Sequence, residues 1–399
     1  MLGLGAFGLA GALTLAALVA PARDAAAAAT YTPSDAAAVV ARVPARDPAE
    51  LSARWTLAAA PDRVELAVEL ARADLRRYRT LSDPRFLGRA QATLAPWWGL
   101  AEPPHDVLLL RATIRQSLHD FDAAKADLDR AVAARPEDAQ AHLTRAVVAT
   151  VTADYARARE SCAAVGPLAG PLVAAACDAP LDAIAGKTDE AYARLGRALA
   201  VARGADAEVR GWARTALAEL AIVRGDGDAA AAHLRAALAL DAHDAYARDL
   251  LADVLLEGGR AAEASALLAG REAIDSHLVR RAIAEHAIGG PDAAKLAGAM
   301  RERIAAAAAR GDRIHLREEA RFALAVDRDA AAAVQLARDN WAVQQELADA
   351  RLLAEAAAAA RDPEAARPVI AWARANGLRD AQLEQLMVRI ERVAPLEAR

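Results

Sequence analysis

An alanine pair spaced twelve residues apart recurs eight times along the 399-residue chain. A small residue on each of two short antiparallel helices lets their backbones approach closely, so the recurrence predicts a series of helical hairpins. Because each hairpin must bury one face against its neighbours, one stacked body is expected rather than several separate domains. The pairs are Ala112/Ala124, Ala146/Ala158, Ala179/Ala191, Ala218/Ala230, Ala252/Ala264, Ala282/Ala294, Ala320/Ala332 and Ala354/Ala366.

An apolar residue follows the second alanine by four positions in seven of the eight pairs, which places both residues on one helical face. Gly298 occupies this position in the remaining pair. The second alanines recur at a period of about 34 residues, which is typical of helix–turn–helix repeats. The apolar residues are Leu128, Cys162, Leu195, Leu234, Leu268, Leu336 and Ile370.

Turn signals and the absence of strand patterns predict an all-α chain. No sustained period-two alternation of β-branched residues is present. A helix is expected over 64–79, then a turn at 80–84 and a second helix over 85–95. Inside later hairpins, Asp120, Asp154 and Asp362 stand where an N-cap carboxylate can accept free first-turn N–H groups.

The N-terminal residues 1–22 lack charged side chains and end in the small-x-small triplet 20–22. This is the outline of an export signal, although no Lys or Arg precedes the apolar run. Two alternatives stay open, because such a run can also remain as an inner-membrane anchor or form a buried helix. We expect residues 1–29 to be a signal peptide or anchor, 30–60 a tail and capping helix, and 61–399 the hairpin stack with a C-terminal capping helix.

The net charge bears on the class of partner. It is -5 at pH 7, and the isoelectric point is near 6.0. A protein that binds nucleic acid needs a basic surface to neutralise phosphates, so we expect no nucleic-acid partner.

The segment 105–138 resembles a tetratricopeptide repeat. Ala112, Ala124, Leu128 and Pro136 match the small, small, large apolar and proline positions of that pattern. Segments beginning at Gly211 and Ala245 resemble it as well. The resemblance covers roughly residues 60 to 375. It implies an all-α fold, an α-solenoid of about eight to nine tetratricopeptide-like hairpins that forms a superhelix, with ligands bound in a concave groove.

Two further stretches, 90–98 and 338–344, resemble parts of exported bacterial tetratricopeptide-repeat proteins. This resemblance implies a non-enzymatic scaffold or adaptor of the bacterial cell envelope, located in the periplasm, with a protein or peptide as partner. The alternative is an auxiliary or regulatory subunit of a transporter or enzyme complex, held at the membrane only through residues 1–22. An enzyme that uses carboxylates in the groove is a third alternative.

The groove-facing positions of the family can be transferred onto the clearest repeats. Trp212 and Tyr246, which are one repeat apart, would stand side by side there with an acidic rim, a combination that suits an apolar or basic peptide segment. Alternatively, both aromatic residues pack between hairpins. Farther along, Arg317, Arg321 and Arg351 would make the groove basic. The candidate groove-binding residues are Leu109, Thr113, Gln116, Trp212, Glu219, Tyr246, Asp249, Asp253, Arg317 and Arg321.

The chain has two cysteines, Cys162 and Cys177, and the repeat register places them on adjacent helices. In an exported protein this arrangement favours a disulfide, and the alternative is two buried free thiols. No zinc-protease, phosphate-loop or paired-cysteine motif occurs in the sequence. We therefore expect no catalytic residue, no metal and no cofactor.

Overall fold

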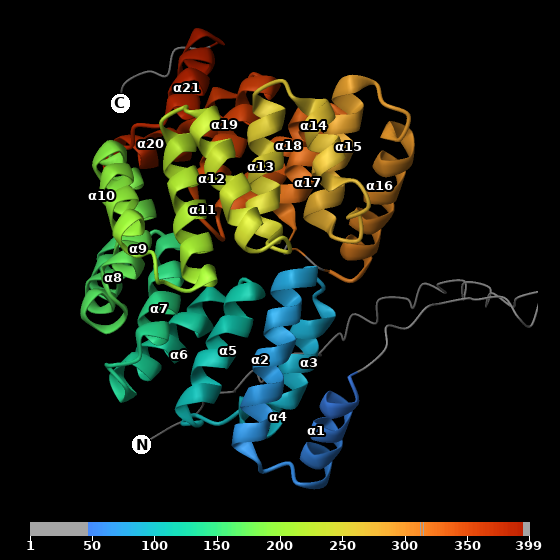
Figure 1. Cartoon of the computed structure of the whole chain (residues 1–399). Coiled ribbons are helices and arrows are strands. Elements are labelled where there is room, and N and C mark those ends of the chain that lie inside the picture. Colours follow the sequence, from blue (N-terminus) through green and yellow to red (C-terminus); the bar gives the residue numbers. More distant parts are fainter. Residues whose placement is uncertain (1–46, 312, 314, 394–399) are drawn as a thin grey trace, which may run out of the picture. The chain divides into compact units, whose positions relative to one another are not determined.

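The computed structural model describes residues 47–311, 313 and 315–393, and every regular element among them is a helix (Figure 1). The predicted signal or anchor at 1–29, and the tail as far as residue 46, lie outside the described residues. None of the described helices combines the length and the apolar character needed to span a bilayer.

The helices follow one another through short links. Their bounds are α1 (Pro48–Ala59), α2 (Val64–Leu81), α3 (Arg85–Thr93), α4 (Ala95–Trp98), α5 (His105–Ser117), α6 (Phe121–Ala134), α7 (Ala139–Val151), α8 (Tyr155–Ala169), α9 (Pro171–Ile184), α10 (Thr188–Val201), α11 (Ala207–Val223), α12 (Gly227–Leu240), α13 (Ala245–Glu257), α14 (Ala261–Leu268), α15 (Asp275–Ile288), α16 (Ala293–Ala309), α17 (Leu316–Phe322), the π-helix η1 (Ala323–Asp327), α18 (Ala330–Trp341), α19 (Leu347–Ala360), α20 (Pro363–Asn376) and α21 (Ala381–Val393).

These helices pair into nine hairpins within the described residues. Each pair packs against the next, from α2/α3 through α5/α6 to α19/α20. Two of the three predicted Asp caps are confirmed: Asp154 accepts from the N–H of Arg157, and Asp362 accepts from that of Ala365. Asp120 stands at the N-cap of α6 but its side chain accepts no cap hydrogen bond, so that prediction is wrong. The expected α-solenoid of eight to nine hairpins is confirmed.

Six of the eight alanine pairs lie where the sequence places them. In the α11/α12 hairpin, for example, Ala218 and Ala230 have no exposed surface, and Leu234 is equally buried one helical turn later. A methyl group at each position lets the two helix backbones approach closely, because a larger side chain would need the space between them.

The register expected for the other two pairs is wrong. In the hairpins α5/α6, α7/α8, α9/α10, α11/α12 and α13/α14, five helical residues follow the first alanine and three residues form the link. The α15/α16 hairpin has one more helical residue after the first alanine and one more residue in the link. The buried positions are therefore Leu296 and Met300, and Ala294 is exposed. In the α17/α18 hairpin, the π-helix η1 extends the first helix before the link. Ala333, one residue later than predicted, is fully buried in place of Ala332.

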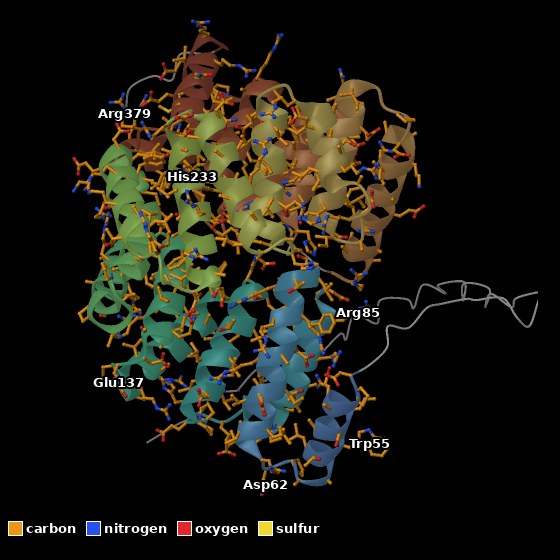
Figure 2. The ribbon with its side chains drawn as sticks, in the orientation of Figure 1. Trp55, Asp62, Arg85, Glu137, His233 and Arg379 are labelled. Carbon is orange, nitrogen blue, oxygen red and sulfur yellow. A yellow bond between two sulfur atoms is a disulfide. The ribbon has the colours of Figure 1, made fainter. Side chains whose placement is uncertain are left out.

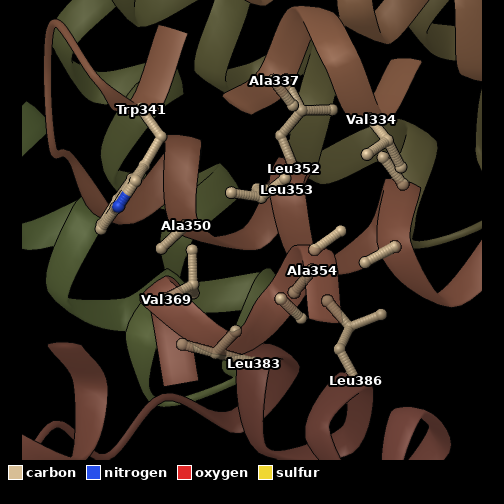
Figure 3. Close-up of a cluster of buried hydrophobic side chains, with 14 of the residues drawn as sticks. Val334, Ala337, Trp341, Ala350, Leu352, Leu353, Ala354, Val369, Leu383 and Leu386 are labelled. Carbon is tan, nitrogen blue, oxygen red and sulfur yellow. The ribbon is translucent and has the colours of Figure 1, made fainter. Parts of the chain in front are cut away.

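The last hairpins share a core that includes the final helix. Trp341, Leu353 and Val369 come from α18, α19 and α20, and Leu383 and Leu386 of α21 complete the cluster (Figure 3). An end repeat lacks a neighbour, so a capping helix is needed to cover its apolar face. Helix α21 provides this cover.

Residues far apart in the sequence also meet. The N–H of Gln345 donates to the carbonyl oxygen of Val151 at 2.7 Å, and Trp372 Nε1 donates to Tyr155 Oη at 2.7 Å. Arg321 Nη1 lies 2.7 Å from Asp253 Oδ1. The C-terminal hairpins therefore lie against the middle ones, as Figure 1 shows for the orange and red helices beside the yellow-green ones.

Ala230→Leu tests the close approach of α11 and α12. Three extra carbons at a position without free space should lower the free energy of unfolding by about 1–3 kcal/mol. Ala232→Leu on the exposed side of the same helix is the matched control and should change it by less than about 0.5 kcal/mol. Chemical denaturation measures both. Equal effects of the two substitutions would contradict the register.

Candidate binding cavity

A cavity of about 820 Å³ lies along the first helices of five consecutive hairpins, α5, α7, α9, α11 and α13. Apolar side chains form much of its wall, among them Leu143 and Val147 of α7, Val173 of α9 and Trp212 of α11. Glu346, in the link between α18 and α19, reaches it from the C-terminal hairpins. The cavity is thus bounded by the face that the repeat register assigns to ligands.

Half of the ten predicted groove residues line this cavity, and the other half do not. Leu109 is buried in the core between α5, α6 and α7. Asp249, Asp253, Arg317 and Arg321 lie in ion-pair networks outside the cavity. The five lining residues are Thr113, Gln116, Trp212, Glu219 and Tyr246.

Trp212 combines the two roles that the sequence left open. Part of its indole packs against the hydrophobic clusters of α9 and α11 and of Cys162 and Cys177. The same side chain also lines the cavity. Tyr246 is more open, with 53% of its surface exposed. The two aromatic residues therefore belong to one cavity, and Trp212 anchors its wall in the core.

Glu219 carries the most perturbed charge at the cavity. Burial and, to a smaller extent, the nearby negative charge of Glu346 raise the pKa of its carboxyl group to about 7. Tyr246 Oη donates a hydrogen bond to Glu219 Oε1 at 2.5 Å, and this bond opposes the rise by stabilising the carboxylate. The carboxyl group of Glu219 therefore titrates near neutral pH rather than in the usual range of a glutamate.

The predicted basic stretch of the groove is not formed by free arginines. Arg317 Nε lies 2.6 Å from Asp349 Oδ1, and its guanidinium also pairs with Glu346. Arg351 Nε donates to Asp380 Oδ1 at 3.0 Å. Because each guanidinium faces a carboxylate, these residues hold hairpins and the final helix together, and the expected basic part of the groove is not formed.

Asp249 and Asp253 belong to an ion-pair network between α13 and α15. Arg280 contacts both oxygens of Asp253, at 2.8 and 2.9 Å. Burial raises the pKa of Asp249 to about 6 and lowers that of the adjacent His277 to about 4. This network joins neighbouring repeats, and in the described part of the chain no group of three or more His, Cys, Asp or Glu residues is arranged to hold a metal ion.

A second cavity, of about 200 Å³, separates the middle and C-terminal hairpins. Leu256 and Glu257 at the end of α13 line it together with Arg321 and Arg351. The chain's own C-terminal helices thus occupy this part of the first-helix face, and the open part is the 820 Å³ cavity.

Cys162 on α8 and Cys177 on α9 form a disulfide, with their Cα atoms 5.5 Å apart. Both side chains are buried, and Cys177 also contributes to the wall of the large cavity. The bond therefore joins two hairpins at the point where Trp212 packs.

The register also identifies lining residues that we did not select from the sequence. Leu143 and Val147 lie one repeat after Leu109 and Thr113, so extending the pattern to the next hairpin would have found them. Glu346 carries no such signal, because its position depends on contacts between distant hairpins.

No protein-family model matches the chain, and neither does any curated protein. Solved structures are similar to it at low identity. PilW, described as a widely conserved type IV pilus biogenesis factor, is 17% identical, covering 51% of this chain and 95% of its own, with a TM-score of 0.39. A tetratricopeptide repeat protein from Parabacteroides merdae is 14% identical, covering 73% of this chain and 98% of its own, with a TM-score of 0.37. A chain of the APC/C hetero-tetramer Cut9–Hcn1 is 13% identical, covering 82% of this chain and 63% of its own, with a TM-score of 0.48.

Glu219→Gln tests the perturbed carboxyl group. The folded-state pKa of Glu219 lies above its unfolded value, so the stability that the protonated group contributes is lost as pH rises from about 4.5 to 7. The variant should therefore gain stability over wild type near pH 8, by at most about 3 kcal/mol, relative to the same comparison near pH 4. Urea denaturation at both pH values measures this difference, and a pH-independent difference would contradict it.

Reduction of the disulfide should destabilise the fold. Opening a 15-residue loop removes about 3 kcal/mol by the chain-entropy relation. Denaturation with and without dithiothreitol measures the loss, and a Cys162→Ala/Cys177→Ala double variant, which has no bond to reduce, is the control. Two free thiols in the oxidised, unfolded protein would show that the bond does not form.

Proposed function

We propose that this protein is a non-enzymatic scaffold or adaptor that binds an extended segment of a partner protein in the cavity along α5, α7, α9, α11 and α13. The observation that carries the proposal is the cavity itself, about 820 Å³ in volume and built on consecutive first helices. Ligand pockets usually occupy about 300–1,000 Å³, so this volume is sufficient for several side chains.

The lining residues offer both apolar and polar contacts to a protein segment. Val147 and Tyr246 are 45% and 53% exposed, so two large side chains are available for an occupant to cover. Between the apolar walls stand Thr113, Gln116 and Gln140, whose hydroxyl and amide groups can bond peptide N–H and C=O groups. Because helices hold these groups, little ordering accompanies binding.

The bacterial cell envelope, and the periplasm in particular, is the proposed location. Residues 1–22 have the composition of an export signal, with an inner-membrane anchor as the alternative. The Cys162–Cys177 disulfide supports export independently, because such bonds persist in oxidising compartments.

Val147→Trp tests whether the cavity is the binding site. The larger side chain would take up space in the cavity from a position that is already 45% exposed, so the fold should be retained. Phage-displayed random dodecapeptides selected on the wild-type protein should lose at least about tenfold in affinity for this variant. Biolayer interferometry with the selected peptides measures the change.

Ile288→Trp is the matched control. Ile288 is also 45% exposed, but it lies at the end of α15 and lines neither of the two cavities described above. It should bind the selected peptides as wild type does. If no peptide is selected, or if both variants bind equally well, the cavity is not a site for protein segments.

A further inference from the structure

Three carboxylates line the large cavity in the described part of the chain: Glu346, Glu208, which is exposed at the start of α11, and Glu219, which is partly buried and has no cationic partner. Within the part of the chain that the structure describes, Glu219 accepts a hydrogen bond from Tyr246 Oη and forms no ion pair. Glu346, the nearest acid, is already paired with Arg317. Arg79 of α2 is the one base among the described lining residues, and it does not pair with Glu219.

A partly buried carboxylate without a counter-charge favours a cation beside it. Removing the group from water disfavours its ionised form, and the negative charge of Glu346 disfavours it further. A guanidinium or ammonium group placed next to Glu219 would reverse both effects through a charge-assisted hydrogen bond. A neutral or acidic side chain in the same place would leave the penalty or increase it.

The apolar wall begins close to this carboxylate. Trp212 precedes Glu219 by two helical turns on α11, so both face the cavity about 10 Å apart along the helix axis. An extended chain covers that distance in about three residues. A segment running along α11 would therefore meet Glu219 and the wall of Trp212, Val173 and Val147 with side chains close together in its sequence.

We propose that the occupant of this cavity is a protein segment that carries an Arg or Lys side chain within two to four positions of a large apolar one, with its cationic group paired to Glu219. The proposal rests on the proposed function, since it specifies the segment that the cavity holds. It assigns Glu219 and Tyr246 to charge recognition, and Trp212, Val147 and Val173 to the apolar side chain.

The first test compares peptide pools selected in parallel on the full-length wild-type protein and on Glu219→Gln, from one phage library of random dodecapeptides. Glu137→Gln removes an exposed carboxylate from the link between α6 and α7 and is the charge control (Figure 2). We expect Arg and Lys to be enriched several-fold over the starting library by wild type and by Glu137→Gln. Glu219→Gln should show no such enrichment, while still selecting apolar residues.

The second test uses one basic peptide from the wild-type pool and its analogue with citrulline, a neutral isostere, in place of arginine. The titratable groups nearest Glu219 are Tyr246 on α13, which is neutral in this pH range, and Glu346, which pairs with Arg317 of α17. Near pH 8 the arginine peptide should bind wild type at least about tenfold more tightly than the citrulline peptide. Near pH 5.5, where Glu219 is protonated, the ratio should fall towards one, and in Glu219→Gln it should be about one at either pH.

The outcomes separate the two proposals. Pools with equal basic content, enrichment of acidic residues, or a citrulline peptide that binds as tightly as the arginine peptide would overturn the charge recognition and leave the cavity as a peptide site. Absence of any peptide that depends on Val147 would overturn both. Retained binding of the citrulline peptide by Glu219→Gln shows that this variant is folded.

Discussion

The close approach of two helices at a pair of alanines is the contact on which the rest of the structure depends. At Ala218/Ala230 and Ala252/Ala264 neither side chain is exposed. The two helices of each hairpin can pack closely there because neither position carries a side chain larger than a methyl group. This contact decides which face of the first helix turns inward. It thereby also decides which face is left for the cavity and presents Trp212 and Tyr246 to it.

Much of this arrangement could be predicted from sequence because it is local. The hairpins, the Asp caps at Asp154 and Asp362 and five of the cavity residues follow from a pattern that recurs with every hairpin. The register failed where the hairpin geometry changes: η1 adds one residue before α18, and α15 and its link add two before Leu296. Alanine spacing cannot report such insertions in a chain where alanine also fills exposed positions such as Ala294.

Contacts between distant hairpins were the other feature beyond the sequence pattern. Arg317, Arg321 and Arg351 look like a basic surface in the repeat register, yet Arg317 and Arg321 meet carboxylates from other hairpins and Arg351 meets Asp380, next to the final helix. The same packing brings Glu346 to the cavity and raises the pKa of Glu219. An arginine on a first helix can face either a ligand or another repeat, and its own segment contains nothing that distinguishes the two.

The hydrogen bond from Gln345 to Val151 changes how the stack behaves mechanically. In a simple linear array each repeat contacts only its neighbours, so the end repeats can fray while the middle stays folded. Here the link between α18 and α19 is hydrogen-bonded to the end of α7, and Trp372 is hydrogen-bonded to Tyr155. The array is thereby closed into a ring of contacts. Detaching the last hairpins one at a time would break these contacts and expose the walls of the middle ones, so we expect the two halves of the stack to unfold together.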